Sequence, residues 1–339
     1  MANTRFSYVK HFEQDTILLP ESWPVVRVDG RGFTKFSKLH EFRKPNEPLA
    51  LGVMNAAAAH VMSTFDDIVL AYGHSDEYSF LFKRDTRLYN RRMQKILSSV
   101  VSAFSSAFSF YWSRFYPDRQ LKILPSFDGR IVLYPRFENI VDYFSWRHAD
   151  CHINNQYNIC FWCLVADGKC PDEAYKWLKH TQKGEKNEYI YQSRGINYNN
   201  LPRIFRKGTT LVRLLSTEPG LGQCVQDGIT TKVDRGSIDC QATDRHRLDT
   251  SIVNTRQQAT GDVIELTIDE SEIALISQKL DSICNPMGIG VVHCDNTSEA
   301  FWNAAAPSYS MDGGTRTKKN IDTIAALSTD MINKLNSGR

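Results

Sequence analysis

The order of its apolar segments constrains the fold of this chain more than any other feature of the sequence. In the first 135 residues, short segments rich in β-branched and aromatic residues alternate with two longer segments whose apolar residues repeat at helical spacing. The expected strands are 24–29, 67–73, 76–83 and 129–135, and the expected helices are 47–64 and 88–114. The resulting order, β-α-β-β-α-β, predicts an α+β fold with a ferredoxin-like core of the kind found in polymerase palms. Such a fold hosts many functions, so the function depends on where its polar residues lie.

The rest of the chain has a different pattern, which divides it into further regions. Residues 136–215 combine helical segments with Asn-rich ones and end in the strand-like GTTLVRLL. The next stretch is polar, so we expect an insertion, partly disordered, with a short structured piece at VIELTI and a helix at SEIALISQKLDSI. We therefore expect a palm-like catalytic core at 1–135, followed by a mostly helical C-terminal extension. That extension comprises the Asn-rich region at 136–215, the polar insertion at 216–290 and a C-terminal segment at 291–339.

Composition restricts the class of protein further. The formal net charge is only +3, so the molecule as a whole lacks the charge typical of a nucleic-acid-binding protein. The N-terminal stretch MANTRFSYVKHFEQD has no apolar segment like that of a signal peptide, and no run of about 18 apolar residues predicts a membrane span. We therefore expect no membrane association. The expected location is the cytoplasm and/or nucleus, and the sequence is also compatible with a mitochondrial pool. The eight cysteines are expected to be free thiols, and we interpret the CxxC at Cys160 and Cys163 as two buried thiols on a helix.

Acidic residues stand at the ends of two predicted strands. The stretch VVRVDGRGF opens as a buried strand and reaches Asp29, and the hairpin YGHSDEYSF carries Asp76 and Glu77 at its tip. The first and third strands of a β-α-β-β-α-β sheet are antiparallel neighbours, so we expect Asp29 and Asp76 to face each other. Two close carboxylates repel each other, and Mg²⁺ relieves that repulsion while also binding substrate phosphates. We therefore expect a magnesium site for phosphoryl or nucleotidyl transfer, with the Gly30 carbonyl as a further ligand; the alternative is a turn-capping Asp29 and a solvated acid pair.

A second DGR tripeptide, at 128–130, occupies a different position. It precedes its predicted strand instead of ending one. We therefore expect Asp128 to be a turn residue at the far rim of the sheet, away from the acids of the predicted metal site.

A nucleotide site also needs cations for the triphosphate. Arg27 lies on the first predicted strand, as a candidate phosphate contact, and Lys44 lies in the loop FRKPNEP. Ser75 precedes Asp76, where its hydroxyl can donate to a phosphate oxygen. A basic cluster opens the second long helix and comprises Arg91, Arg92 and Lys95. The alternative for this cluster is a solvated helix face.

Two Asn-rich segments, HINNQYN at 152–158 and NYNN at 197–200, lie among Lys, Arg and His residues. Asn side chains both donate and accept hydrogen bonds, which suits the unstacked bases and 2′-hydroxyls of RNA. Helix caps and loop hydrogen bonds are the alternative reading. The residues alone therefore indicate a metal-dependent nucleotidyl-transfer enzyme or a nucleotide cyclase, with RNA as a candidate substrate of the former.

Seven segments of the chain resemble, in order, the tRNA-histidine guanylyltransferase family. They are VVRVDGRGF, FRKPNEPLAL, AYGHSDEYSFLFKR, LPSFDGRIVLYP, SWRHADCHINNQYN, EKNEYIYQSRGINYNN and FRKGT. The resemblance covers about residues 1–213, with a weaker likeness at VVHCDNTSEAFW. The HINNQYN motif and the SDEYSF hairpin are its most specific parts.

The resemblance implies an enzyme that adds a single guanylate to the 5′ end of histidine tRNA, at position −1, in the 3′-to-5′ direction. In this family ATP first adenylylates the 5′-monophosphate. The 3′-hydroxyl of GTP then attacks and releases AMP, and the new 5′-triphosphate loses pyrophosphate. The family uses two Mg²⁺ ions, takes ATP and GTP as substrates and acts as a homotetramer, a dimer of dimers.

The motifs place the family's functional residues on this chain. The resemblance implies that Asp29, the Gly30 carbonyl and Asp76 hold the metal ions, and that Glu77 is a further catalytic acid. The implied nucleotide-binding set comprises Asp29, Gly30, Arg31, Gly32, Phe33, Thr34, Lys44, Ser75, Asp76, Arg92 and Lys95. The residues linked to tRNA binding or activation are His152, Asn155, Lys186 and Asn199. The chain departs from the family pattern at Leu201, where Glu is usual, and in the stretch 216–288, which has no counterpart.

Two alternatives accompany the guanylyltransferase hypothesis. One is a template-directed 3′-5′ repair polymerase that mends truncated 5′ ends of tRNAs. The other is a non-catalytic RNA-binding protein on a palm scaffold, which would be expected to lack an acid of the site. All three acids are present.

Overall fold

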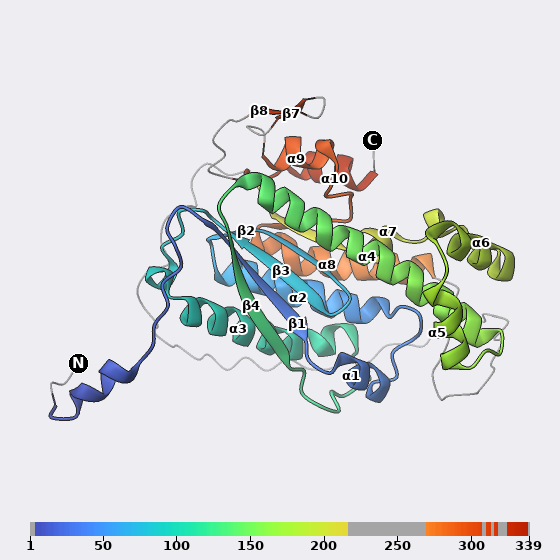
Figure 1. Cartoon of the computed structure of the whole chain (residues 1–339), viewed down its shortest axis with the longest axis horizontal. Coiled ribbons are helices and arrows are strands. Elements are labelled where there is room, and N and C mark those ends of the chain that lie inside the picture. The colour runs from blue at the N-terminus through green and yellow to red at the C-terminus, as the bar shows by residue number, and fades with distance from the viewer. Residues whose placement is uncertain (1–3, 216–268, 307–309, 313–314, 318–323, 338–339) are drawn as a thin grey trace, which may run out of the picture.

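A six-stranded antiparallel sheet lies at the centre of the protein, in the strand order β4-β1-β3-β2-β5-β6 (Figure 1). The computed structural model describes residues 4–215, 269–306, 310–312, 315–317 and 324–337. The strands are β1 (Trp23–Gly30), β2 (Ile68–His74), β3 (Glu77–Phe82), β4 (Phe127–Tyr134), β5 (Thr209–Arg213) and β6 (Ile289–Val292). A separate hairpin consists of β7 (Ser310–Asp312) and β8 (Thr315–Thr317). The four strands expected in the first 135 residues are confirmed, with ends that differ by one or two residues.

Helices cover both faces of the sheet. They are α1 (Phe33–Leu39), α2 (Pro48–Thr64), α3 (Met93–Phe115), α4 (Phe137–Ala166), α5 (Pro171–Lys179), α6 (Lys183–Arg194), α7 (Arg203–Lys207), α8 (Glu270–Cys284), α9 (Glu299–Ala305) and α10 (Thr329–Ser337). Four short 3-10 helices are η1 (Ser7–Phe12), η2 (Leu88–Arg91), η3 (Tyr198–Asn200) and η4 (Asn285–Met287). The β-α-β-β-α-β order of the first 135 residues is present, with α1 as an additional short helix after β1. No helix among the described residues is long and apolar enough to cross a membrane.

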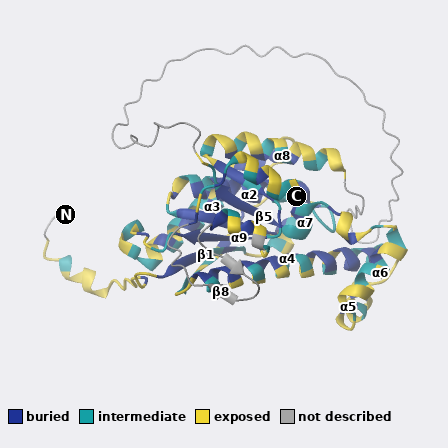
Figure 2. Cartoon of the chain, turned by 90° about the horizontal axis from the view of Figure 1, so that it is seen from above, coloured by how far each residue is buried: buried dark blue, intermediate teal, exposed yellow. Residues whose placement is uncertain are grey.

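Strand periodicity separates the interior into two cores. Alternate side chains of a strand point to opposite faces, so Val26 and Val28 of β1 pack with α2, α3 and α8, whereas Val25 packs with α4, α9 and α10. Figure 2 shows these layers, with α8 and α2 on one side of the sheet and α4 on the other. The sheet is therefore covered on both faces, and the acids Asp29, Glu77 and Asp128 lie at its strand ends.

Helix α4 runs without interruption through the Asn-rich segment HINNQYN. Its first half packs on the sheet, and its second half forms a third core with α5 and α6. Cys160 and Cys163 lie in this third core as buried free thiols, which confirms the interpretation of the CxxC. Burial raises the pKa of both thiols, which disfavours the reactive thiolate form at neutral pH. Leu201, at the position where Glu is usual in the family, is buried in the same core.

The C-terminal part of the chain completes the sheet and both of its covering layers. Strands β5 and β6 extend the sheet beyond β2, and α8 confirms the helix expected at 271–283. The sheet and its cores therefore continue across the boundaries expected after residues 135 and 290. Residues 216–268, which include VIELTI, lie outside the described residues. The division into regions by function stays a prediction.

Candidate active site

Asp29 and Asp76 lie together at one end of the sheet. Asp29 is paired in register with Glu77 across β1 and β3. The amide of Gly30 donates a hydrogen bond to the Asp76 carbonyl over 3.0 Å. A Cβ atom built on Gly30 would lie only 2.9 Å from the Cβ of Asp76. The two acids therefore occupy adjacent strand ends, as the antiparallel pairing of the first and third strands predicts.

The electrostatics of this pair favour a bound cation. Burial, followed by the negative charge of Glu77, raises the pKa of Asp29. Burial and the charge of Asp29 raise the pKa of Asp76, although the Ser75 hydroxyl donates to Asp76 Oδ1 over 2.9 Å and acts in the opposite direction. Nearby Arg27 lowers the pKa of Asp29 but does not cancel these effects. Two carboxylates whose ionised forms are disfavoured are the donor set that a divalent cation stabilises.

The donors present suit Mg²⁺ better than a transition metal. Among the described residues, no group of three or more His, Cys, Asp and Glu side chains is arranged to hold a metal ion. Mg²⁺ does not need one, because it uses one or two carboxylates and completes its octahedron with water and substrate phosphates. Asp29, Asp76 and the carbonyl of Gly30 are the residues that would hold it.

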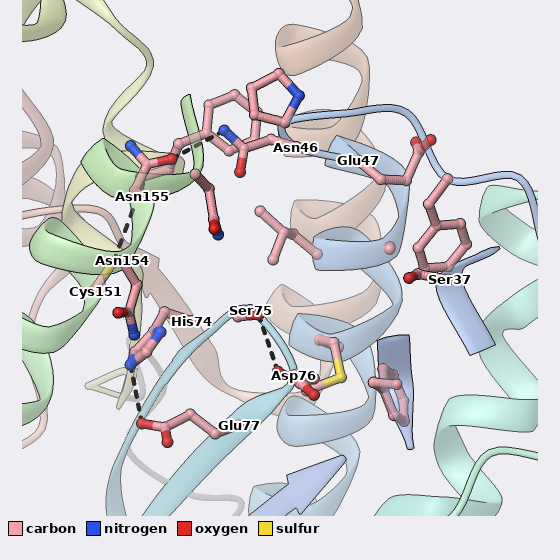
Figure 3. Close-up of a pocket in the computed structure, with 18 of the residues that line it drawn as sticks. Ser37, Asn46, Glu47, His74, Ser75, Asp76, Glu77, Cys151, Asn154 and Asn155 are labelled. Atoms are coloured by element: carbon pink, nitrogen blue, oxygen red, sulfur yellow. Dashed lines mark hydrogen bonds and ion pairs between the residues drawn. The ribbon is translucent and has the colours of Figure 1, made fainter. Parts of the chain in front are cut away.

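Glu77 has a different environment from the two aspartates. Its carboxylate is buried between β3 and α4, where Arg147 Nη1 donates to both of its oxygens at 3.0 Å. On the other side, His74 Nε2 lies 2.9 Å from Glu77 Oε1 (Figure 3). Burial alone would raise the pKa of Glu77, but His74 and Arg147 outweigh it and hold the pKa below its usual value. Glu77 therefore fastens the hairpin that carries Asp76 to α4.

Asp128 also lies at the end of the sheet that holds the acids, and the expectation that it lies at the far rim is wrong. It belongs to β4 and is paired in register with Asp29. Since β4 runs antiparallel to β1, the start of β4 meets the end of β1. The charge of Asp128 contributes to the raised pKa of Asp29. Its own side chain is largely exposed and lies 3.6 Å from Arg130.

A cavity of about 470 Å³ opens beside the two acids. Three walls enclose it, and the close-up of Figure 3 shows the side chains that point into it. The β2–β3 hairpin forms one wall, α1 with the loop before α2 and the first turns of α2 forms the second, and α4 with α7 forms the third. Residues of the expected nucleotide set that line the cavity are Asp29, Phe33, Thr34, Lys44, Ser75 and Asp76. Arg31 and Gly32 form the turn between β1 and α1, where Gly32 adopts a φ of 68° that favours glycine.

The basic cluster at the start of α3 lies elsewhere. Arg92 forms a bridge with Ile17 and lies 3.6 Å from Asp15, close to the start of β1. The ammonium group of Lys95 lies 4.9 Å from the centre of the Tyr89 ring. Leu97, two residues after Lys95, packs against Gly129, which is paired in register with Val28 next to Asp29. Arg92 and Lys95 do not line the cavity, and their role as triphosphate partners stays a prediction. Arg27 lies on the same face of β1 as Asp29, two residues before it.

Family models match nearly all of the N-terminal 268 residues. The model described as tRNAHis guanylyltransferase matches residues 6–135, and the model described as the Thg1 C terminal domain matches residues 138–268. A probable tRNA(His) guanylyltransferase of Drosophila melanogaster is 53% identical over 214 residues, which are 63% of this chain and 74% of that protein. The tRNA(His) guanylyltransferase of Schizosaccharomyces pombe is 51% identical over 63% of this chain and 82% of its own. The chain belongs to the tRNAHis guanylyltransferase family.

Membership in the family makes this protein a nucleotidyltransferase, and the fold agrees. The crystal structure of the tRNA(His) guanylyltransferase from Saccharomyces cerevisiae is 45% identical and superposes with a TM-score of 0.59. The match covers 61% of this chain and 93% of that one. The mixed fold of helices and antiparallel sheet is therefore shared with a family member of known structure.

The residues that the family resemblance links to tRNA fall into two groups. Asn155 lies in the cavity wall, where its Oδ1 accepts from Asn46 over 3.0 Å and its Nδ2 donates to the Tyr198 hydroxyl over 3.2 Å. His152 packs edge-on against the same tyrosine, with ring centres 5.1 Å apart. Lys186 and Asn199 lie outside the cavity lining, on α6 and η3. Tyr198 thus links His152 and Asn155, and Asn199 is its neighbour in the chain; of the four residues, Asn155 alone lines the cavity.

Five further residues of α4 line the cavity and were absent from the predicted set: Asp150, Cys151, Asn154, Asn158 and Trp162. Asp150, Asn154, Asn158 and Trp162 follow one another at intervals of four residues, so they share one face of the helix. The four-residue spacing would have predicted a shared helix face only if HINNQYN had been expected to be helical. The sequence pattern instead indicated that the Asn-rich segments interrupt the helices.

Gly30→Ala is expected to distort the site in this member of the family. The added methyl group would lie 2.4 Å from the Phe33 ring and 2.9 Å from the Cβ of Asp76. Phe33 cannot move aside easily, because Phe36 stacks on it and Phe108 and Phe127 pack beside it. Overpacking of this kind costs about 1–3 kcal/mol, which thermal unfolding measures. Gly184→Ala is the control, since no heavy atom lies within 4 Å of its added Cβ, and it should leave the midpoint unchanged or raise it.

Proposed function

We propose that this enzyme adds a single guanylate to the 5′ end of histidine tRNA, at position −1. The observation that carries the proposal is the pair of half-buried, mutually repelling carboxylates of Asp29 and Asp76 beside the cavity. It occurs in a chain about half identical to proteins named tRNA(His) guanylyltransferases. We also propose that the β-α-β-β-α-β core works as a polymerase palm, and that the enzyme acts as a homotetramer.

The proposed reaction has three steps. An oxygen of the tRNA 5′-monophosphate attacks the α-phosphorus of ATP, so that a phosphoanhydride forms and pyrophosphate leaves. The 3′-hydroxyl of GTP then attacks the activated 5′-phosphorus, loses its proton and releases AMP. Finally, hydrolysis removes pyrophosphate from the new 5′-triphosphate. Each substitution at phosphorus needs neutralisation of charge and alignment of the attacking and leaving oxygens.

The residues of the site meet these needs in separate ways. Mg²⁺, held by Asp29, Asp76 and the Gly30 carbonyl, would lower the pKa of the attacking hydroxyl and neutralise phosphate charge. Lys44 lies in the cavity wall, where its ammonium group suits a phosphate. The Ser75 hydroxyl holds Asp76 in place, and Glu77 anchors the hairpin on α4. Asn46 and Asn155 present amide groups, which suit a base or a ribose.

An incorporation assay tests the proposal. Monophosphorylated histidine tRNA that lacks the −1 nucleotide is incubated with the full chain, Mg²⁺, ATP and labelled GTP. The expected product is an RNA one nucleotide longer, formed together with AMP. Preference for tRNAs with truncated 5′ ends would instead identify a repair polymerase. Binding of the tRNA without release of AMP would identify a non-catalytic RNA-binding protein.

A further inference from the structure

Helix α8 reaches the candidate active site from a part of the chain that the two family models do not match. Its residues, 270–284, lie beyond the ranges 6–135 and 138–268 that the two family models match. Ile276, Leu280 and Cys284 are buried in the core that also contains α2 and α3. In Figure 2, α8 lies against α2 on the side away from the sheet. The helix is therefore firmly packed.

The first turn of α8 holds an arginine from the cavity wall. Arg43 Nη2 donates to Glu272 Oε1 over 2.5 Å, although the two residues are 229 positions apart in the sequence. The same guanidinium group donates to both oxygens of Glu47, over 3.3 Å from Nε and 3.2 Å from Nη2. Glu47 in turn caps α2, since its Oε1 accepts from the amide of Leu49 over 3.4 Å. Arg43 thus links the first turn of α8 to the first turn of α2.

The segment between these anchors forms one side of the cavity. Residues 43–47 all line it, and they include Lys44 and Asn46. Asn46 is tied to α4 through Asn155, and Lys44 Nζ lies 3.5 Å from Ser37 Oγ. The position of the segment 43–47 therefore depends on contacts at both of its ends. The contact from α8 is the ion pair of Arg43 with Glu272, whose side chains are only about one-fifth exposed.

We propose that Glu272 is a positioning residue for nucleotide binding, which acts by fixing Arg43 and so the wall that carries Lys44 and Asn46. The proposal rests on the proposed function, because it assumes that the cavity takes the triphosphate nucleotide. Glu272 does not line the cavity. Its loss should therefore weaken binding of nucleotide while leaving the chemical step at the two aspartates nearly unchanged.

Glu272→Ala and Glu272→Gln test this role in the full chain. We expect the Kd for GTP, measured by equilibrium dialysis in Mg²⁺, to rise about fivefold to twentyfold, a range typical of coupling between sites. The KM for GTP should rise in parallel, with kcat within twofold. Glu270→Ala is the matched control, since Glu270 is an exposed acid of the same helical turn and should leave Kd unchanged.

The possible results distinguish failure of the positioning role of Glu272 from failure of the proposed guanylyltransferase function. An unchanged Kd in both Glu272 variants, or an equal rise in the Glu270 control, would overturn the positioning role. A fall in kcat with Kd unchanged would also overturn it. If the parent chain binds GTP but adds no guanylate to histidine tRNA, the proposed function fails while the Kd comparison still decides the role of Glu272. The Gln variant keeps the shape of the side chain, and helix packing through Ile276 and Leu280 is independent of it.

Discussion

Asp76→Asn is expected to abolish guanylate addition and to leave the chain folded. The amide keeps the shape of the side chain but removes the charge that would neutralise a divalent cation beside Asp29. We expect the single-turnover rate of guanylate addition to fall by about 1,000-fold or more, equivalent to about 4 kcal/mol of transition-state stabilisation. Asp29→Asn should have the same effect. Activity near that of the parent in either variant would contradict the metal-site assignment.

Although Asp76→Asn should lose activity, it should not lose thermal stability in the absence of a divalent cation. A carboxyl group whose pKa is raised by folding stabilises the folded state most below its unfolded pKa of about 3.9, and that contribution is lost as the pH rises through the folded value. Because the pKa of Asp76 is raised, its ionisation costs stability at pH 7 when no divalent cation is bound. Asp76→Asn should therefore unfold at the same or a higher temperature than the parent at pH 7 in a chelator. Mg²⁺ should stabilise the parent but not the variant.

Asp128→Asn is the matched control for both measurements. It removes a carboxylate from the same end of the sheet, paired in register with Asp29, but its side chain is exposed and lies near Arg130. We expect it to retain most of the activity and the stabilisation by Mg²⁺. A loss as large as that of Asp76→Asn would show that general negative charge at this end of the sheet, and not the Asp29–Asp76 pair, is what the reaction needs.

The core of the site was predictable because it depends on local patterns and one rule of topology. Apolar segments located β1 and β3, and their antiparallel pairing placed Asp29 beside Asp76. The same rule, applied to the fourth strand, would have placed Asp128 at the same end, because β4 is also antiparallel to β1. Asp128 was placed at the far rim because only its position at the start of its own strand was considered. The antiparallel direction of that strand relative to β1 was left out.

The remaining parts of the site depend on contacts between distant segments. Asn and His have low helix propensity, so HINNQYN did not read as helix; α4 is stabilised there by tertiary contacts such as that of Asn155 with Tyr198. The ion pair of Arg43 with Glu272 joins residues on opposite sides of the polar stretch 216–268. Nothing in the local sequence of either residue indicates the other.

Arg147→Ala is expected to be the most destabilising of the substitutions considered. Arg147 is only 5% exposed, its Nη1 donates to both oxygens of Glu77, and its guanidinium group lies 3.4 Å from the centre of the Trp146 ring. Its removal leaves Glu77 buried with the His74 ring, 2.9 Å away, as its nearest remaining partner. Loss of one partner of a buried ion pair costs about 3–5 kcal/mol, which urea unfolding at pH 7 measures.

The pH dependence distinguishes loss of this ion pair from loss of packing. The pKa of Glu77 is lowered by folding, so Glu77 contributes stability above its unfolded pKa of about 4.3, and that contribution disappears as the pH falls through the folded value. Arg147→Ala should therefore lose less stability than the parent as the pH falls from about 5 to about 2, the range around and below the unfolded pKa in which that contribution disappears. Arg130→Ala, which removes an exposed arginine near Asp128, should cost at most about 0.5 kcal/mol. If Arg147→Ala and the parent lose equal stability on acidification, the cost comes from packing on Trp146, and Glu77 does not depend on Arg147 for its charge.

The double variant Glu77→Gln with Arg147→Met should recover part of the stability that Arg147→Ala loses, because neither substituted side chain leaves a buried charge without a partner.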